Sequence, residues 1–186
     1  MARKLRQNEP GGIYHVFARG NNRERIFVDD RDRTHYLTRY QQAARRLGWR
    51  SLSYCLMHNH VHLLVETPQP NLSAGMQFVQ GAYAQIFNKR HGRVGHVFQG
   101  RYGAVMMRSD AQVCMAAAYI ARNPVEAGLC RAPADWPWSS FSQATEVEHV
   151  GWLDQQRLLG FFGDSPDVAL RRYIEMSLST PYEPGR

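Results

Sequence analysis

Hydrophobic and polar positions follow two periodicities along the first two thirds of the chain. Four runs are rich in β-branched and aromatic residues, as strands are: 12–19, 49–56, 60–66 and 101–107. Three segments carry apolar or small residues at helical spacing: 30–47, 72–90 and 110–123. The order is strand, helix, strand, strand, helix, strand, and then an additional helix. This order predicts the α+β class, with a ferredoxin-like split β-α-β antiparallel sheet that carries helices on one face.

Turn and capping residues set the expected boundaries of these elements. Gly48 is expected to end the first helix, because glycine readily adopts the left-handed conformation. Residues 57–59 are expected to form a tight connection between two strands. Asn71 is expected to cap the second helix. Pro124 is expected to limit the third helix at Asn123, because the residue before a proline disfavours helical geometry.

The C-terminal part of the chain is typical of an appendage to this domain. The sequence WPWSSF is followed by helical spacing near 154–161 and 166–178. We therefore expect one domain over residues 1–142 and a C-terminal helical extension over residues 143–186, packed on or near the domain.

The composition is that of a globular protein, and a cytoplasmic location is expected. Apolar residues make up 44% of the 186 residues, too many for a disordered chain. No run approaches the roughly 18 consecutive apolar residues of a membrane-spanning helix, and the basic start lacks the apolar segment of a secretory signal. The three cysteines lack C-x-x-C spacing, so neither a disulfide framework nor a zinc ribbon is supported. We expect no membrane association and a reducing compartment.

The charge distribution indicates a polyanionic partner. The formal net charge is +7, and 17 Lys and Arg residues stand against 6 Asp and Glu residues in 1–108. The remaining residues, 109–186, are acidic, with 6 against 10. Arginine supplies almost all of the positive charge, and its planar fork suits phosphate groups. An ordinary basic surface is the alternative, so charge alone leaves nucleic acid open.

His60 and His62 stand two residues apart in the strand-like run HVHLLVE. Side chains alternate across a sheet, so both imidazoles leave the face that also carries Leu64. The residues expected on the opposite face, against helices, are Val61, Leu63 and Val65. Two neighbouring neutral imidazoles can chelate one divalent ion. A pair of this kind can equally be an ordinary polar pair, and His58 has the same parity at the connection.

The third predicted helix carries a polar-leaning face. Its apolar stripe consists of Val113, Ala116, Ala117 and Ile120. A separate face carries Met115, Tyr119, Arg122 and Asn123, with Tyr119 and Asn123 one turn apart. A partly buried tyrosine with a solvated hydroxyl would explain this face. The alternative is a phenol aimed at a metal-bound phosphate, with the Asn123 amide oxygen as a third metal ligand. A tyrosine can attack a phosphodiester and form a covalent phosphotyrosine.

Two motifs together resemble a known family. They are N-H-V-H-L-L at 59–64 and Y-I-A-R-N-P-V-E-A-G-L at 119–129. The pair resembles the HUH single-tyrosine transposases, and within them the bacterial REP-associated tyrosine transposases. The segments GGIYHVFARGNNRERIF and HGRVGHVFQGRY stand in the order that this family shows, and the resemblance covers residues 10–142.

The resemblance implies a DNA-cleaving and DNA-rejoining enzyme. It assigns Tyr119 as the catalytic nucleophile in the additional helix, His60 and His62 as metal ligands, and Asn123 as the third ligand. The cofactor would be a divalent ion, Mg²⁺ or Mn²⁺. The substrate would be single-stranded DNA at palindromes folded as hairpins, cleaved to a 5′-phosphotyrosine and a free 3′-hydroxyl. One departure is His58, which stands where the family usually has proline.

Several basic and polar residues are candidates for DNA contacts, although a solvated surface would also explain them. They are Arg19, Asn21, Asn22, Arg23, Lys89, Arg90, Arg93 and Arg101. Splayed bases are expected to stack on Phe98 or Tyr102. Packing or support of the metal ligands is expected for His15, Trp136 and Trp138.

Two other functions are compatible with the sequence. A ferredoxin-like sheet can serve as a non-catalytic nucleic-acid-binding module, and the same histidine pair could serve a metal-dependent hydrolase that uses activated water. The active site could be built by a monomer or a homodimer. The acidic C-terminal part could fold over the basic cleft and compete with DNA, although an ordinary packed appendage would explain it as well.

Overall fold

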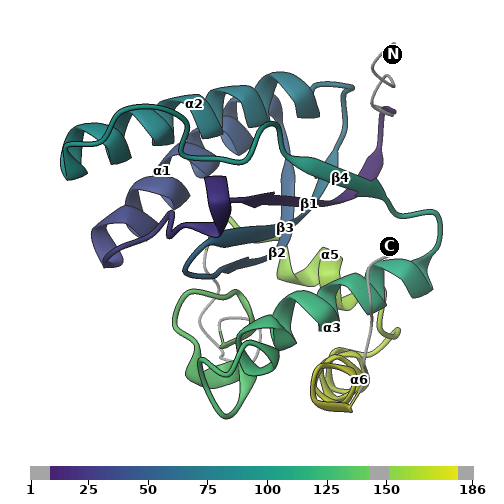
Figure 1. Cartoon of the computed structure of the whole chain (residues 1–186). Coiled ribbons are helices and arrows are strands. Elements are labelled where there is room, and N and C mark those ends of the chain that lie inside the picture. The colour runs from purple at the N-terminus through teal and green to yellow at the C-terminus, as the bar shows by residue number, and fades with distance from the viewer. Residues whose placement is uncertain (1–8, 143–150, 180–186) are drawn as a thin grey trace, which may run out of the picture.

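A four-stranded antiparallel sheet forms the middle layer of the computed structural model, which describes residues 9–142 and 151–179 (Figure 1). The strands, in the order in which they lie side by side, are β2 (Arg50–Leu56), β3 (His60–Thr67), β1 (Gly12–Arg19) and β4 (Gly103–Met106). Helix α1 (Asp30–Leu47) connects β1 to β2, and α2 (Leu72–His91) connects β3 to β4. This is the ferredoxin-like arrangement that the residue pattern predicted.

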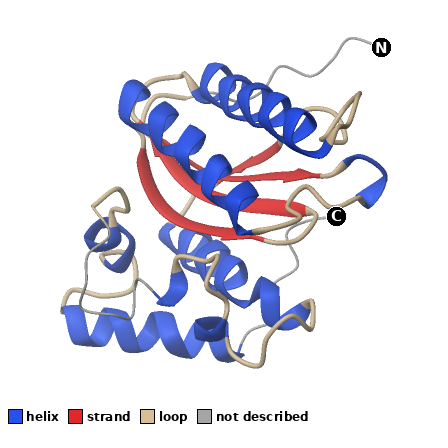
Figure 2. Ribbon diagram, turned by 90° about the vertical axis from the view of Figure 1, so that its left-hand side faces the viewer, coloured by secondary structure: helices blue, strands red, loops and turns tan. Residues whose placement is uncertain are grey.

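Helices cover the two faces of the sheet (Figure 2). Helices α1 and α2 lie on one face, and the additional helices lie on the other (Figure 1). These additional helices are α3 (Asp110–Glu126), α5 (Gln155–Leu159) and α6 (Pro166–Ser179). Two short 3-10 turns follow β1 and α3, namely η1 (Asn21–Arg23) and η2 (Pro133–Asp135). Helix α3 lies across β2 and, less extensively, β3.

The alternation of side chains in β3 divides the apolar interior into two cores. Val61, Leu63 and Val65 are buried in the core shared with α1 and α2. Leu64 is buried in the other core, which α3 and the C-terminal helices complete. The parity predicted from the sequence is therefore confirmed. It places His60 and His62 on the α3 face of the sheet.

The ends of α1 and α2 are joined by side chains. Gly48 ends α1 at φ 69°, as predicted. Asn71 is the residue before α2, but its side chain makes no capping hydrogen bond. Its amide instead accepts a hydrogen bond from Trp49 Nε1 (2.6 Å) and donates one to the Leu47 carbonyl (3.1 Å). Asn71 therefore fastens the second helix to the end of the first.

Helix α3 continues through Pro124 to Glu126, so the predicted end at Asn123 was wrong. Proline lacks only its own backbone N–H, and the turn beyond it is closed by a 3.0 Å hydrogen bond from the Ala127 N–H to the Asn123 carbonyl. Pro124 is itself buried, which favours continuation of the helix. Asn123 consequently lies inside a regular helix, with its side chain direction fixed.

The described part of the C-terminal extension packs on the domain. Leu158, Phe162 and Tyr173 share one apolar core with Val113 of α3 and with Phe141. In the described part of the chain, no helix is long and apolar enough to cross a membrane.

Candidate active site

A cavity of about 450 Å³ lies on the α3 face of the sheet, beside the β1 and β4 strands. Its lining includes His15, Phe17 and Arg19 of β1, His60 and His62 of β3, Val105 of β4, Tyr119 of α3, and Arg101 from the loop that precedes β4. Helix α3 lies across β2 and, less extensively, β3, and the cavity opens beside it, over β1 and β4. One chain thus brings the predicted nucleophile and the predicted histidine pair to a single cavity.

Strand register fixes the positions of the two histidines. His60 pairs with Arg19 and His62 pairs with Phe17 in the antiparallel β1–β3 ladder. The imidazole centroids of His60 and His62 are 5.1 Å apart, with the rings nearly perpendicular at 88°. The sheet therefore holds both rings on one face at a separation that a single ion can bridge.

A chain of amide contacts fixes the tautomer of His60. The Asn59 amide donates through Nδ2 to the Arg23 carbonyl (2.9 Å), so its Oδ1 faces His60. The Nδ1 of His60 lies 2.7 Å from that oxygen and donates to it. Burial lowers the pKa of His60, the contact with Asn123 partly opposes this shift, and the positive charge of Arg19 lowers the pKa further. A neutral His60 with its proton on Nδ1 presents an unprotonated Nε2 to the cavity side.

The Nε2 of His60 faces another acceptor. It lies 3.2 Å from Oδ1 of Asn123, so in this tautomer two lone pairs point toward one another. Ligand atoms that each lie about 2.1 Å from a six-coordinate Mg²⁺ are about 3 Å apart. The pair therefore has the spacing of two neighbouring ligands of one cation, and a cation would relieve the contact. Asn123 is buried, and its Nδ2 has no hydrogen-bond partner within the described residues.

His62 is oriented by a third imidazole. His15 Nε2 and His62 Nδ1 are 2.9 Å apart in a buried hydrogen bond. This contact occupies one ring nitrogen of His62 and leaves its Nε2 for a ligand. Burial lowers the pKa of His62 well below 6.5, and the neighbouring His15 and His60 lower it further. Burial likewise lowers the pKa of His15 to about 4. All three imidazoles are therefore neutral at pH 7, as metal ligands must be.

Tyr119 lies against this histidine cluster. Its ring centroid is 5.5 Å from that of His62, edge-on at 85°, and 5.8 Å from that of His15. Asn123 follows one turn later on the same face of α3 and contacts His60. The predicted face of α3 is thus turned toward the predicted pair in β3.

The predicted metal ligands fit a divalent cation by chemistry and spacing. They comprise two neutral imidazoles and one amide oxygen, a set compatible with Mn²⁺ and, with added water ligands, Mg²⁺. Within residues 9–142 and 151–179, no group of three or more His, Cys, Asp or Glu side chains is placed to hold a metal ion. A metal site here would consequently depend on Asn123 as the third ligand.

The predicted DNA-contacting residues lie in three places. Arg19 and Arg101 line the cavity. Asn21, Asn22 and Arg23 form η1, just beyond the end of β1. Lys89 and Arg90 lie in the last turn of α2 and Arg93 just beyond it, all outside the cavity lining.

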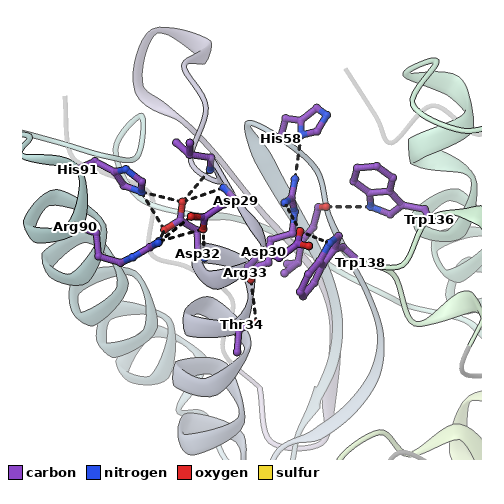
Figure 3. Close-up of polar contacts among 12 residues, drawn as sticks. Asp29, Asp30, Asp32, Arg33, Thr34, His58, Arg90, His91, Trp136 and Trp138 are labelled. Carbon is purple, nitrogen blue, oxygen red and sulfur yellow. Dashed lines mark hydrogen bonds and ion pairs between the residues drawn. The ribbon is translucent and has the colours of Figure 1, made fainter.

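Two residues at the end of α2 are held by ion pairs within the chain. Arg90 pairs with Asp29 (2.9 Å) and with buried Asp32 (Figure 3). Arg93 pairs with Glu24. A DNA contact from these guanidinium groups would have to compete with the carboxylates, whereas those of Arg19 and Arg101 lie at the cavity itself.

The expectation that bases stack on Phe98 or Tyr102 was wrong. Both side chains are buried, at 7% and 4% exposure, in the core beneath α1 and α2. An exposed aromatic residue that sequence reasoning missed, Phe17, lines the cavity instead. The alternation of side chains along the strand could have identified it, because Phe17 lies two residues after His15 in β1 and so shares its face.

His58 contributes no imidazole to the cavity. Arg33 donates a hydrogen bond to its Nδ1 (3.0 Å), and its ring lies 5.6 Å from that of Trp136 (Figure 3). Arg33 is itself buried among the rings of Phe27, Trp136 and Trp138, at 5.5–5.7 Å. The packing role expected for the two tryptophans is confirmed. This cluster fastens the turn before His60 to α1.

The described part of the acidic C-terminal extension does not cover the cavity. Residues 151–179 include α5, which contacts β2, and α6, which contacts α3. None of these residues is among those that line the cavity. Competition of the acidic extension with DNA would therefore have to come from residues 143–150 or 180–186, which lie outside the described residues.

Comparisons with known proteins identify the family of this chain. A protein of Haemophilus influenzae (strain Rd) named as a REP-associated tyrosine transposase is 22% identical over 159 residues, which cover 80% of this chain and 90% of that protein. The fold matches the structure of a REP-associated tyrosine transposase bound to a REP hairpin, with a TM-score of 0.67 and 18% identity over 83% of this chain and 90% of the other. The model of the family described as "Transposase IS200 like" matches residues 10–123. The match covers more than half of the chain, which therefore belongs to the IS200-like transposase family.

Proposed function

We propose that this protein is a metal-dependent single-tyrosine transposase that cleaves and rejoins single-stranded DNA at hairpin-forming palindromes. The observation that carries the proposal is the position of the Tyr119 ring, 5.5 Å from the His62 ring and in the same cavity as His60. Hairpin DNA is supported as the partner by the basic body of the chain and by the matched structure, which contains a REP hairpin. One chain supplies every residue of the site, so a monomer suffices to build it.

Tyr119 would act as the nucleophile. Its phenolic oxygen forms a bond to the scissile phosphorus while the bond from phosphorus to the 3′-oxygen breaks. The phenol loses its proton, and the leaving 3′-oxygen takes one up to become a hydroxyl. The product is a 5′-phosphotyrosine that keeps the energy of the phosphate ester. Attack by another 3′-hydroxyl reverses the step and rejoins DNA without nucleotide hydrolysis.

His60, His62 and Asn123 would hold a divalent ion, Mg²⁺ or Mn²⁺. When bound, this ion withdraws charge from the scissile phosphate and orients it. None of the three side chains carries a negative charge, so they leave the charge of the ion undiminished for the phosphate. Asn59 and His15 hold the rings of His60 and His62 from behind, at 2.7 and 2.9 Å.

An adduct assay tests the proposal. The protein is incubated with Mn²⁺ or Mg²⁺ and a panel of imperfectly palindromic hairpin oligonucleotides with single-stranded flanks. We expect a denaturation-resistant protein–DNA adduct that Tyr119→Phe abolishes while DNA binding persists, and that EDTA also abolishes. Tyr102→Phe is the matched control, because the Tyr102 hydroxyl contacts Ser73 (3.0 Å) outside the cavity.

Three results would contradict the proposal. An undiminished adduct with Tyr119→Phe would remove Tyr119 from the role. Cleaved strands without any adduct would indicate a hydrolase that uses activated water. Salt-sensitive binding without cleavage, unaffected by EDTA, would indicate a non-catalytic nucleic-acid-binding module.

A further inference from the structure

Phe17 is an exposed aromatic residue in a central strand. It is 38% exposed, whereas the residues that precede it in β1 are buried. Single exposed apolar side chains are common on protein surfaces and need no function. Phe17 differs from such residues in its location, because it lines the same cavity as His60, His62 and Tyr119.

The ring of Phe17 is held in place by the adjacent edge strand. Phe17 pairs with Gly103 of β4. A Cβ atom at Gly103 would lie 2.3 Å from the Phe17 ring, so the ring rests directly over the glycine backbone. The φ angle of Gly103 is not positive, so its backbone conformation does not require glycine. What glycine provides at this position is space for the Phe17 ring. The aromatic surface is therefore preorganised and need not be ordered when a ligand binds.

The ring is also adjacent to the reacting groups. Its centroid is 6.4 Å from that of His62 and 5.7 Å from that of His15. Arg19 lies two residues further along the same face of β1 and lines the cavity with Arg101. An apolar ring flanked by two guanidinium groups matches a nucleotide, whose base is aromatic and whose phosphate is anionic.

We propose that Phe17 is a stacking platform for one nucleobase of the single strand that flanks the scissile phosphate. The proposal rests on the proposed function and deepens it by naming a subsite for the substrate. Because every base has a π-face, this subsite would position the strand without selecting a base. Selection of the hairpin would then reside elsewhere on the basic surface.

The test measures stacking without cleavage. Tyr119→Phe protein in EDTA is bound to the hairpin that gives the adduct, or to the tightest-binding hairpin of the panel if none does. The fluorescent base 2-aminopurine replaces each flanking nucleotide in turn. We expect quenching centred on one position, lost in Phe17→Leu and retained in Phe17→Tyr. Phe78→Leu is the matched control, because Phe78 is 42% exposed on α2, away from the cavity.

A thermodynamic cycle separates stacking from a change in the fold. Phe17→Leu is expected to weaken DNA binding about tenfold, the usual effect of losing one base–aromatic stack. An abasic site at the quenched position alters only the DNA and should weaken binding of the parent protein equally. It should have little further effect on Phe17→Leu, because both changes remove one contact.

Specific outcomes overturn the platform. No position of quenching, or unchanged affinity in Phe17→Leu, would remove Phe17 from DNA binding. Fully additive effects of the abasic site and of Phe17→Leu would show that the base at this position does not contact the Phe17 ring. Quenching with an RNA strand of the same sequence, but not with DNA, would show that the ligand of this subsite is RNA. An adduct without quenching would support the proposed transposase function and refute only this subsite. Failure of the subsite is therefore distinguishable from failure of the proposed function.

Discussion

The imidazoles of His15 and His62 share a buried hydrogen bond of 2.9 Å between Nε2 and Nδ1. If His62 is to bind an ion through Nε2, its Nδ1 must carry the proton and donate to His15. The remaining proton of His15 then resides on Nδ1, which is buried without a hydrogen-bond partner among the described residues. His15 would therefore act as a positioning residue for His62.

Replacing His15 should weaken metal binding more than it weakens the fold. We expect His15→Phe to lower Mn²⁺ affinity about 10–100-fold, the usual cost of losing a group that orients a metal ligand. His15→Gln keeps a carbonyl acceptor and should recover part of the affinity. Electron paramagnetic resonance titration of free Mn²⁺ measures this without any DNA. Equal affinities for the parent and His15→Phe would contradict the role.

The fold should lose stability as the pH falls below neutrality. Burial lowers the pKa of His15 to about 4 from 6.5, so between these values the unfolded chain takes up a proton that the folded chain does not. Stability therefore falls as the pH drops from about 6.5 to about 4, and His15 alone accounts for about 3 kcal/mol. Urea denaturation at several pH values checks this. His15→Phe should show a shallower dependence, and a parallel curve would contradict the assignment.

Gly103→Ala should disturb the cavity without altering the sheet. The added methyl group would overlap the Phe17 ring, so the ring must move away from β4. We expect a destabilisation of about 1–3 kcal/mol from overpacking. DNA affinity should fall by a similar factor to that in Phe17→Leu. Gly81→Ala is the control, because a Cβ there meets no atom within 4 Å. Unchanged DNA binding in Gly103→Ala would contradict the fixed position of the ring.

The cavity arginines should dominate the electrostatic part of DNA binding. Arg19→Ala or Arg101→Ala is expected to reduce the slope of log affinity against log salt by about one, the effect of losing one phosphate contact. Arg93→Ala should change the slope less, because Arg93 is paired with Glu24. Fluorescence anisotropy over a salt series measures all three. A larger loss in Arg93→Ala than in Arg19→Ala would place the DNA along the end of α2 instead.

Arg33 should stabilise the fold through its aromatic surroundings. Its guanidinium group contacts three aromatic rings, Asp30 and His58 (Figure 3). Arg33→Ala would remove the cation–π contacts to these rings and the hydrogen bond to His58, and we expect a loss of about 2–4 kcal/mol. Arg45→Ala, on the exposed side of α1, should change stability by less than about 0.5 kcal/mol. Equal urea midpoints for the two variants would contradict this role.

Local patterns were sufficient to predict the elements and the parity of β3. Alternation alone placed His60 and His62 on one face, and helical spacing alone placed Tyr119 and Asn123 on another. That these two faces meet depends on the packing of α3 across the sheet. The periodicity of the sequence does not predict this packing. From the sequence, it could be inferred only through the family resemblance.

Contacts between residues far apart in sequence explain what was missed. The bond between His15 and His62 spans 47 residues, and the pairing of Phe17 with Gly103 depends on the edge strand. Phe98 and Tyr102 follow a glycine-punctuated loop and looked accessible, yet the loop folds back onto α2 and buries them. Asn71 is a residue type that commonly caps helices, but its side chain forms hydrogen bonds with Trp49 and Leu47 instead.

Mass-spectrometric mapping of the covalent adduct tests the central claim most directly. Protein trapped on a hairpin oligonucleotide in Mn²⁺ is digested with protease and nuclease, and the modified peptide is sequenced. We predict a single nucleotide joined through its 5′-phosphate to the tyrosine at position 119. A nucleotide on any other residue, or strands cut with no modified peptide at all, would contradict the account.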